Sequence, residues 1–164
     1  MQEDREVFPA VCLSTYDLQD EIGRGAASVV YLARDRRRAE PVAVKVLARP
    51  LAGDATVAGR FMRQARASMR LRHAAIARVY QASHEGLCWY AVAEYVAGEP
   101  LRQWMAHQPA GTRPALALVR QLAGALDYAH GAGVAYGALD PDSVRVRPDG
   151  MPVITALATD DEPA

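Results

Sequence analysis

The first part of the chain alternates apolar and polar residues in the manner of β-strands. Short runs rich in β-branched and aromatic residues predict strands where turn-forming residues separate them. The runs are Tyr16–Ile22, Ser28–Ala33, Val42–Leu47, Ile76–Ala82 and Leu87–Val96. The pattern therefore predicts five strands, of which the first three form an antiparallel meander.

Two stretches have helical periodicity instead. Between Val57 and Leu71, apolar residues recur every three or four positions among several arginines, which predicts one helix. A longer helix is predicted from Pro114 to Gly131, with Thr112 as its N-cap. Because leucine, valine and alanine occupy most of its circumference, this helix has to be covered on more than one side.

The remaining elements predict a chain in two parts. The sequence Gly98-Glu99-Pro100 interrupts the strands, and it is followed by a short helix over Leu101–His107. Two short strands are predicted at Val144–Val146 and Val153–Thr155. We therefore predict an α+β fold with an N-terminal extension over residues 1–15, a sheet-bearing part over 16–97 and a mainly helical part over 98–164.

Composition and charge exclude several classes of protein. The 164 residues carry 19 basic and 19 acidic side chains, and this balance argues against a general nucleic-acid or membrane-surface binder. An acidic N-terminus and the lack of a long apolar stretch predict a cytoplasmic protein. Cys12 and Cys88 have no metal-ligand spacing, so we expect two reduced thiols.

Lys45 is the one lysine among the 19 basic residues. The others are arginine, a bias typical of a GC-rich bacterial genome. In this background a retained lysine indicates a position that needs a compact ammonium group. Chance is the alternative explanation, because a single lysine must lie somewhere.

A glycine-rich turn precedes Lys45 at a distinctive spacing. The run Ile22-Gly23-Arg24-Gly25-Ala26-Ala27-Ser28-Val29-Val30, followed by Val42-Ala43-Val44-Lys45, resembles the phosphate-covering loop and third-strand lysine of protein kinases, particularly bacterial Ser/Thr kinases of eukaryotic type. Further similar segments follow in the family's order. They are Phe61–Ala65, Ala93–Gly98, Leu126–His130, Leu139–Pro141 and Pro148–Gly150. The resemblance implies a kinase-like fold from about Tyr16 to Ala158: a five-stranded antiparallel sheet with one helix, followed by a truncated, mainly helical lobe.

The resemblance also implies an ATP site. Gly23 and Gly25 would let the backbone approach the phosphates, and Lys45 would contact the α- and β-phosphate oxygens. The implied nucleotide-binding residues are Gly23, Gly25, Ser28, Val30, Ala43, Lys45, Glu94 and Val96. The alternative is that these residues only maintain the sheet and its hairpin.

The resemblance fails at the catalytic positions. Tyr136-Gly137-Ala138 stands where the family has His-Arg-Asp, so Ala138 offers no carboxylate to accept a proton. Asp140 replaces a lysine, Ser143 replaces a metal-binding asparagine, and Ala156 replaces the main magnesium ligand. Gln64 replaces the glutamate that pairs with the lysine. Because phosphoryl transfer depends on these charges, the sequence predicts an inactive pseudokinase without a bound metal.

Three functions fit this pattern. The first is a regulatory or scaffold protein that binds a protein partner, and that binds ATP without depending on magnesium. The second is an atypical or residual ATP-dependent Ser/Thr kinase, in which Asp140 or Asp142 acts as base or metal ligand from a shifted loop. The third is a nucleotide sensor whose association with a partner changes on binding.

Two surfaces are predicted to bind a protein partner or a second copy. The chain ends soon after Ala158, where the family continues with a helix that covers the long one, so we expect part of the long helix to be exposed. Its candidate residues are Leu116, Val119, Leu122 and Leu126. A tail folded over this face, or a decaying gene product, is the alternative.

The second surface is the arginine-rich helix. Its residues Arg60, Arg63, Arg66 and Arg70 predict the docking of an acidic or phosphorylated segment. They could instead pair with the acidic tail at residues 160–162, or form an ordinary solvated face.

Overall fold

The computed structural model describes residues 13–107, 112–137 and 139–157, whose contacts form two compact units. The sheet unit comprises the described chain up to Met69 together with Val79–Tyr95. The helical unit comprises Arg70–Arg78 and the described chain from Val96 onward. The domain limits of 16–97 and 98–164 stay a prediction, and the contacts place residues 70–78 with the later part of the chain.

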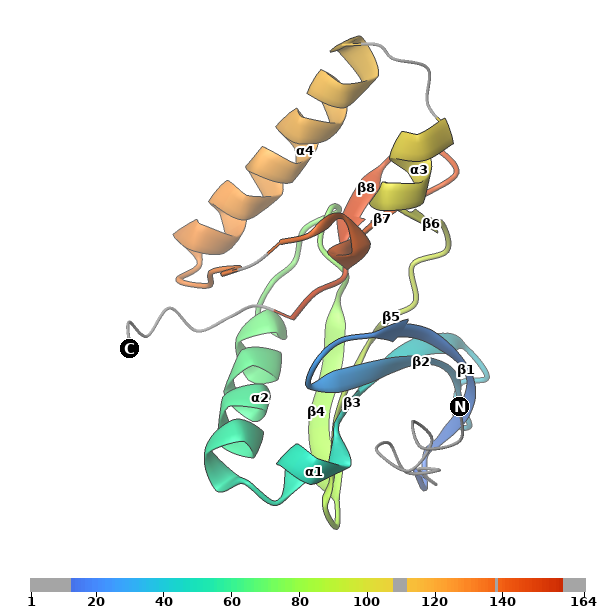
Figure 1. The fold of residues 1–164 in the computed structure, drawn as a ribbon, viewed down its shortest axis with the longest axis vertical. Coiled ribbons are helices and arrows are strands. Elements are labelled where there is room, and N and C mark those ends of the chain that lie inside the picture. The colour runs from blue at the N-terminus through green and yellow to red at the C-terminus, as the bar shows by residue number, and fades with distance from the viewer. Residues whose placement is uncertain (1–12, 108–111, 138, 158–164) are drawn as a thin grey trace. The chain divides into compact units, whose positions relative to one another are not determined.

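The sheet unit is built on a five-stranded antiparallel sheet (Figure 1). Its strands are β1 (Tyr16–Arg24), β2 (Ser28–Asp35), β3 (Pro41–Leu47), β4 (Val79–Glu85) and β5 (Cys88–Glu94). They lie in the order β1-β2-β3-β5-β4. The predicted α+β fold with a five-stranded sheet is therefore confirmed. Some strand boundaries differ from the prediction. Ile76 precedes β4, because it forms bridges with His73 and Ile154 of the helical unit instead, β4 extends to Glu85, and β5 ends at Glu94, before Val96.

Alternation along β3 explains the core of the sheet unit. Val42, Val44 and Val46 are buried on one face, while Ala43 and Lys45 lie half-buried on the other. The cluster on the valine face also contains Leu13, Tyr16, Ala33, Tyr90 and Val92. The face that carries Lys45 is thus the less apolar side of this strand.

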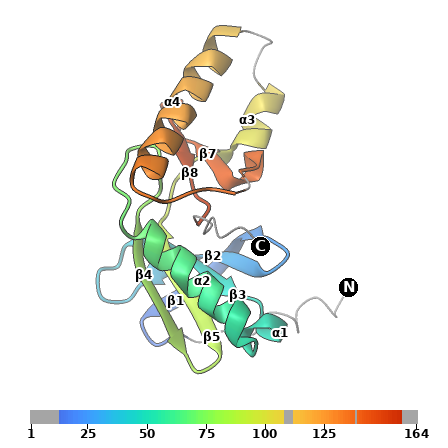
Figure 2. The same ribbon diagram turned by 90° about the vertical axis from the view of Figure 1, so that its left-hand side faces the viewer.

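Two helices belong to the sheet unit, α1 (Arg49–Ala52) and α2 (Ala55–Ser68). Asp54 caps α2, because its carboxylate accepts hydrogen bonds from the backbone N–H groups of Thr56 and Val57. The buried residues of α2 are Ala58, Phe61, Met62, Ala65 and Ser68. They recur every three or four positions, so they form one face, and α2 packs against β4 and β5 (Figure 2).

The helix α2 ends earlier than the sequence pattern predicts. Its last residue is Ser68, whose hydroxyl donates a hydrogen bond to the carbonyl of Gln64 at 2.9 Å. A serine that bonds back in this way competes with the helical ladder, which the apolar period does not reveal. Arg70, predicted to lie on the helix, therefore lies beyond it and in the helical unit.

The helical unit combines two helices with a small sheet. Its elements are β6 (Glu99–Pro100), α3 (Leu101–His107), α4 (Thr112–Gly131), the 3-10 helix η2 (Pro141–Ser143), β7 (Val144–Val146) and β8 (Pro152–Ile154). The strands lie in the order β6-β7-β8 and are antiparallel. Residues 70–78 join this unit through hydrogen bonds: the Ala77 N–H donates to the Ile154 carbonyl, and the Ile154 N–H donates to the Ala75 carbonyl.

The long helix α4 is buried on one side. Leu118, Ala125 and Ala129 are buried, whereas Leu116 is 61% and Val119 59% exposed. The residue predicted as its N-cap, Thr112, is the first residue of the helix. In the part of the chain that the structure describes, no helix is long and apolar enough to cross a membrane.

Candidate functional site

Lys45 lies in the middle of the sheet, with short side chains around it. It pairs with Val30 on β2 and with Ala91 on β5, and Val30 pairs in turn with Gly23 on β1. Directly paired residues of antiparallel strands share a face of the sheet. Gly23, Val30 and Lys45, which the resemblance to protein kinases implies are nucleotide-binding residues, therefore form one row across three strands.

A second row lies beside the first. Ala43 is two residues before Lys45 and on the same face, and it pairs with Leu32 on β2 and with Ala93 on β5. Ala43 and Ala93 are both half-buried. The lysine is consequently flanked by methyl-sized side chains along its own strand and its neighbour.

The ammonium group of Lys45 is a cation held in a half-buried position. Burial lowers the pKa of Lys45 below its ordinary value. Among the residues that the structure describes, its side chain makes no hydrogen bond or ion pair. Gln64, at the position where the family has a glutamate, is half-buried on α2 and neutral. The Lys45 ammonium group therefore has no anion paired with it among the described residues.

The glycine hairpin joins β1 to β2. The Gly25 N–H donates a hydrogen bond to the Ser28 carbonyl at 2.8 Å, and Ser28 is buried and pairs with Leu47. Neither Gly23 nor Gly25 has a positive φ. A Cβ on Gly23 would lie 3.8 Å from the nearest side-chain atom, and one on Gly25 would lie 3.7 Å from the Ser28 carbonyl. The fold of the hairpin does not require glycine at either position.

Two of the residues implied to bind the nucleotide, Glu94 and Val96, fall in different units. Glu94 ends β5 in the sheet unit, where it is half-buried and pairs with Val42. Val96 lies in the helical unit and is 2% exposed, packed with Ala77 and Val153. The Val96 side chain therefore has a packing role, and its contact with a nucleotide stays a prediction.

The residue at the family's lysine position, Asp140, caps a helix. Its carboxylate accepts hydrogen bonds from the N–H groups of Asp142 and Ser143, at 2.8 and 2.9 Å, at the start of η2. Desolvation acts to raise the pKa of Asp140, but these hydrogen bonds, with the Ser143 hydroxyl and the charge of Arg102, outweigh it and lower the pKa. The carboxylate therefore stabilises the local backbone.

The neighbouring positions are also engaged. The Ser143 carbonyl accepts hydrogen bonds from the backbone N–H and the hydroxyl of Thr155, at 2.8 and 3.1 Å. The Asp142 carboxylate pairs with Arg102 at 3.0 Å. Ala156, next to Thr155, brings only a half-buried methyl group. Ala138 lies outside the described residues. Within the described ranges, no three His, Cys, Asp or Glu side chains form a group that could hold a metal.

Tyr136 carries a feature that the sequence did not predict. Its hydroxyl is buried and has no hydrogen-bond partner among the described residues, and burial raises its pKa to about 12. The role of Asp140 could have been found from the sequence, because an aspartate before a proline is typical of a helix start. No local signal indicates the isolation of the Tyr136 hydroxyl, since it depends on distant neighbours.

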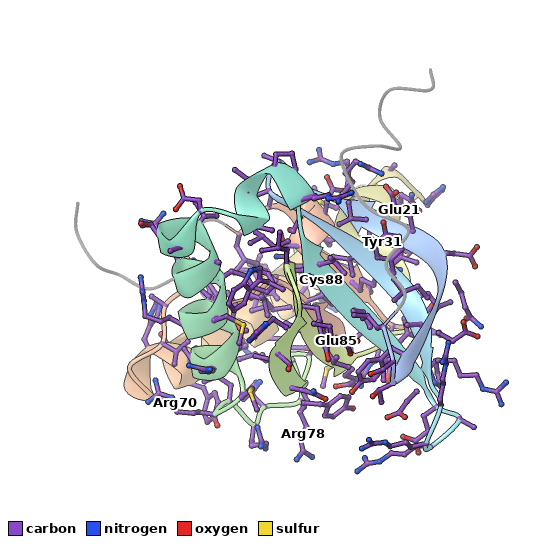
Figure 3. The ribbon with its side chains drawn as sticks, turned by 90° about the horizontal axis from the view of Figure 1, so that it is seen from below. Glu21, Tyr31, Arg70, Arg78, Glu85 and Cys88 are labelled. Carbon is purple, nitrogen blue, oxygen red and sulfur yellow. The ribbon has the colours of Figure 1, made fainter. Side chains whose placement is uncertain are left out.

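The described cysteine is not activated. Cys88 on β5 is half-buried, and burial together with the charge of Glu85 raises its pKa to about 11 (Figure 3). A thiol with this pKa stays protonated near neutral pH and is a weak nucleophile. Cys12, the other cysteine expected to be a reduced thiol, lies outside the described residues.

Comparison with known proteins identifies the family. A family model described as the protein kinase domain matches residues 16–154. The chain therefore belongs to the protein kinase family, as its glycine hairpin and Lys45 indicate. Protein kinases bind ATP, so membership implies an ATP site.

The individual relatives are bacterial. The chain is 33% identical to the serine/threonine-protein kinase PknL of Mycobacterium tuberculosis, over 84% of this chain and 35% of the relative. It is 32% identical to a probable serine/threonine-protein kinase of Clostridium acetobutylicum, over 88% of this chain and 22% of the relative. For PkaA of Streptomyces coelicolor the identity is 34%, over 84% and 27%. The chain thus spans about a third or less of the length of these relatives.

Proposed function

We propose that this chain is a pseudokinase: it binds ATP through the sheet unit, does not transfer phosphate, and acts as a regulatory or scaffold protein. The observation that carries the proposal is the contrast between Lys45 and the catalytic positions. Lys45 is half-buried and makes no ion pair with a described residue, whereas the Ser143 hydroxyl is hydrogen-bonded to Asp140 in a helix cap.

The hairpin and the lysine support nucleotide binding. A polyphosphate would supply the negative charge that the Lys45 ammonium lacks, and a compact ammonium serves this purpose well. Gly23 and Gly25 would offer bare backbone to the phosphates, which explains glycines that the fold itself does not require. When bound, ATP would therefore be held by the row from Gly23 to Lys45.

The helical unit supports the absence of catalysis. A magnesium ion needs oxygen ligands, yet the position of its main ligand in the family is Ala156. The Ser143 hydroxyl donates to Asp140, and Asp142 pairs with Arg102. These residues do not fit the family's magnesium site. We therefore propose ATP binding that does not depend on magnesium.

One observation favours a second function. The relatives are named serine/threonine-protein kinases, so a residual ATP-dependent phosphotransferase is the alternative. In that case Asp142 would have to exchange its pairing with Arg102 for a metal or a substrate hydroxyl. The absence of any phosphate transfer from ATP by the unmodified chain would exclude this alternative.

The exposed face of α4 supports the regulatory role. Leu116 and Val119 are largely exposed, and Leu122 and Leu126 beside them are half-buried. Contiguous apolar surface of this kind is typical of interfaces. We propose that a protein partner or a second copy of the chain covers it. Light scattering over a range of concentrations tests self-association, and a strictly monomeric chain would exclude the second copy.

A thermal-shift titration tests the nucleotide site. ATP should raise the unfolding midpoint equally with magnesium and with a chelator, and the shift should grow with the logarithm of ATP concentration. The Lys45→Met variant should show no shift. Labelled ATP and a generic protein acceptor then test catalysis, with an active bacterial kinase as the positive control. Midpoints that do not respond to ATP would contradict nucleotide binding, and labelled acceptor would contradict inactivity.

A further inference from the structure

One face of α4 combines apolar and charged residues and lies away from the buried side of the helix. Four exposed residues recur there at intervals of four, three and four positions, so they form a line along the helix. These residues, which we call the α4 line, are Leu116, Arg120, Ala123 and Asp127. Positions spaced in this way form the contact seam where two helices pack along each other.

The two charges of the α4 line have no partner within the described chain. Neither the Arg120 guanidinium nor the Asp127 carboxylate makes a hydrogen bond or an ion pair with a described residue. They do not pair with each other, because seven residues along a helix span about 10 Å. Arg102, on the neighbouring helix α3, has by contrast Asp142 beside it. The α4 line thus presents one positive and one negative group to the surroundings of the chain.

A second copy of the chain complements this pattern. In a two-fold symmetric dimer, residue i of one copy contacts residue j of the other, and residue j contacts residue i. Two antiparallel α4 helices, with the axis midway between the charges, place Arg120 of each copy opposite Asp127 of the other. Two ion pairs then form at once. Parallel helices would place each charge opposite its own kind, so the order of the charges specifies an antiparallel pair.

The uncharged residues fit the same arrangement. Ala123 and Gly124 lie at the midpoint between the charges, where small side chains let two helices approach closely. Gly124 is exposed, and a Cβ on it would meet no other part of the described chain within 4 Å. Because glycine weakens a helix interior relative to alanine, packing within the chain does not account for this residue. Leu116 and Val119, 61% and 59% exposed, would be covered beside the ion pairs.

We propose that α4 forms an antiparallel homodimer in which Arg120 of each copy pairs with Asp127 of the other. The inference rests on the proposed role of the exposed α4 face as an interface, and it assigns that face to a second copy of the chain. A uniformly acidic or basic partner would match only one of the two charges, whereas a second copy matches both. The contact does not involve Lys45 or the glycine hairpin, so it does not require a bound nucleotide.

Charge reversal tests the pairing by sedimentation equilibrium. The unmodified chain should form dimers. Arg120→Glu and Asp127→Arg should each weaken self-association at least about tenfold, because each variant places like charges opposite one another at both contacts. An equimolar mixture of the two variants should associate again, since the mixed dimer pairs opposite charges at both contacts. No surface elsewhere on the chain would give this reciprocal result.

Matched variants control for net charge. Arg38→Glu and Asp20→Arg make the same charge changes at exposed positions of the sheet unit, and each should leave self-association within about twofold. Circular dichroism checks that every variant is folded, and Arg120→Gln or Asp127→Asn replaces a reversal that is not. These neutral variants should also weaken self-association.

Three results would overturn the proposal: an unmodified chain that is monomeric at every concentration, α4 variants that associate as tightly as the unmodified chain, or a mixture that does not regain association. A thermal-shift titration of the same samples with ATP keeps this proposal distinct from nucleotide binding. A monomer that responds to ATP contradicts the dimer alone. A dimer that does not respond contradicts the nucleotide site alone.

Discussion

The Ser143 hydroxyl donates a hydrogen bond to the Asp140 carboxylate, with 3.2 Å between Oγ and Oδ1. In the kinases that the chain resembles, a lysine stands at the position of Asp140 and a metal-binding asparagine at the position of Ser143. Here the Ser143 hydroxyl and the Asp140 carboxylate form a hydrogen bond with each other, and the carboxylate also accepts hydrogen bonds from the first N–H groups of η2. The local backbone is thereby stabilised by the pair of residues that would otherwise face a nucleotide and its metal.

Replacing Asp140 should affect stability rather than activity. Asp140→Ala removes an N-cap and should lower the free energy of unfolding by about 0.5–2 kcal/mol. Asp140→Asn keeps an accepting oxygen and should cost much less. Chemical denaturation with urea measures both. If Asp140→Asn instead abolished a phosphotransferase activity, the cap would not be the role of this residue.

The pH dependence of this cap follows from the lowered pKa of Asp140. A carboxyl group whose pKa is lower in the folded than in the unfolded state stabilises the fold above its unfolded pKa, and this contribution is lost as pH falls through the folded pKa. The unmodified chain should therefore lose more stability in acid than Asp140→Asn does. Urea titrations at a series of acidic pH values measure the difference.

Replacing Lys45 should stabilise the chain in the absence of nucleotide. Because burial lowers the pKa of Lys45, its charged form costs stability near neutral pH, and the cost declines as pH rises from the folded pKa toward the ordinary value. Lys45→Met should raise the unfolding midpoint near neutral pH and remove the response to ATP. Lys45→Arg keeps the charge and serves as the control, since it should lose the response without the gain in stability.

An unchanged or lower midpoint in Lys45→Met would show that the ammonium has a stabilising partner. A retained response to ATP in the same variant would show that the nucleotide binds elsewhere. Differential scanning fluorimetry with and without ATP distinguishes these outcomes.

Local pattern was sufficient to predict most of the fold. The strands around Lys45 follow from β-branched runs separated by turn-forming segments, and α3 begins and ends as predicted at Leu101 and His107. The resemblance to protein kinases implies that Gly23, Val30 and Lys45 bind the nucleotide, and the strand register places the three residues in one row. Its role in binding ATP stays a prediction.

Tertiary contacts decide what the pattern did not predict. Ile76 lies in an apolar run that predicts a strand, but its backbone bridges to His73 and Ile154 instead. The isolation of the Tyr136 hydroxyl and the packing of Val96 against Val153 also depend on residues far along the chain. A single sequence does not indicate such pairings when the segments involved are short.

Replacing glycine by alanine should distinguish a glycine that nucleotide binding requires from a glycine that the fold requires. Gly25→Ala places a Cβ in ordinary contact with Ser28, so stability should change by less than about 1 kcal/mol, while the response to ATP should weaken. Gly98→Ala is the contrast, because Gly98 has φ 152° and a Cβ there would collide with the Val146 carbonyl. That variant should lose roughly 2 kcal/mol or more. Thermal unfolding with and without ATP compares them, and severe destabilisation by Gly25→Ala would contradict the proposed role of the hairpin.

Removing one hydroxyl should stabilise the helical unit at one tyrosine and destabilise it at another. The Tyr136 hydroxyl is buried without a described partner, so Tyr136→Phe removes the penalty of an unsatisfied polar group and should raise stability by about 1 kcal/mol. The Tyr128 hydroxyl accepts a hydrogen bond from the Arg72 N–H at 2.9 Å, so Tyr128→Phe should lower stability by about 0.5–1.5 kcal/mol. In a chain of this length, 1 kcal/mol corresponds to roughly 2–4 °C in the unfolding midpoint. Calorimetry of the two variants measures the opposite signs, and a loss of stability in Tyr136→Phe would show that its hydroxyl has a partner after all.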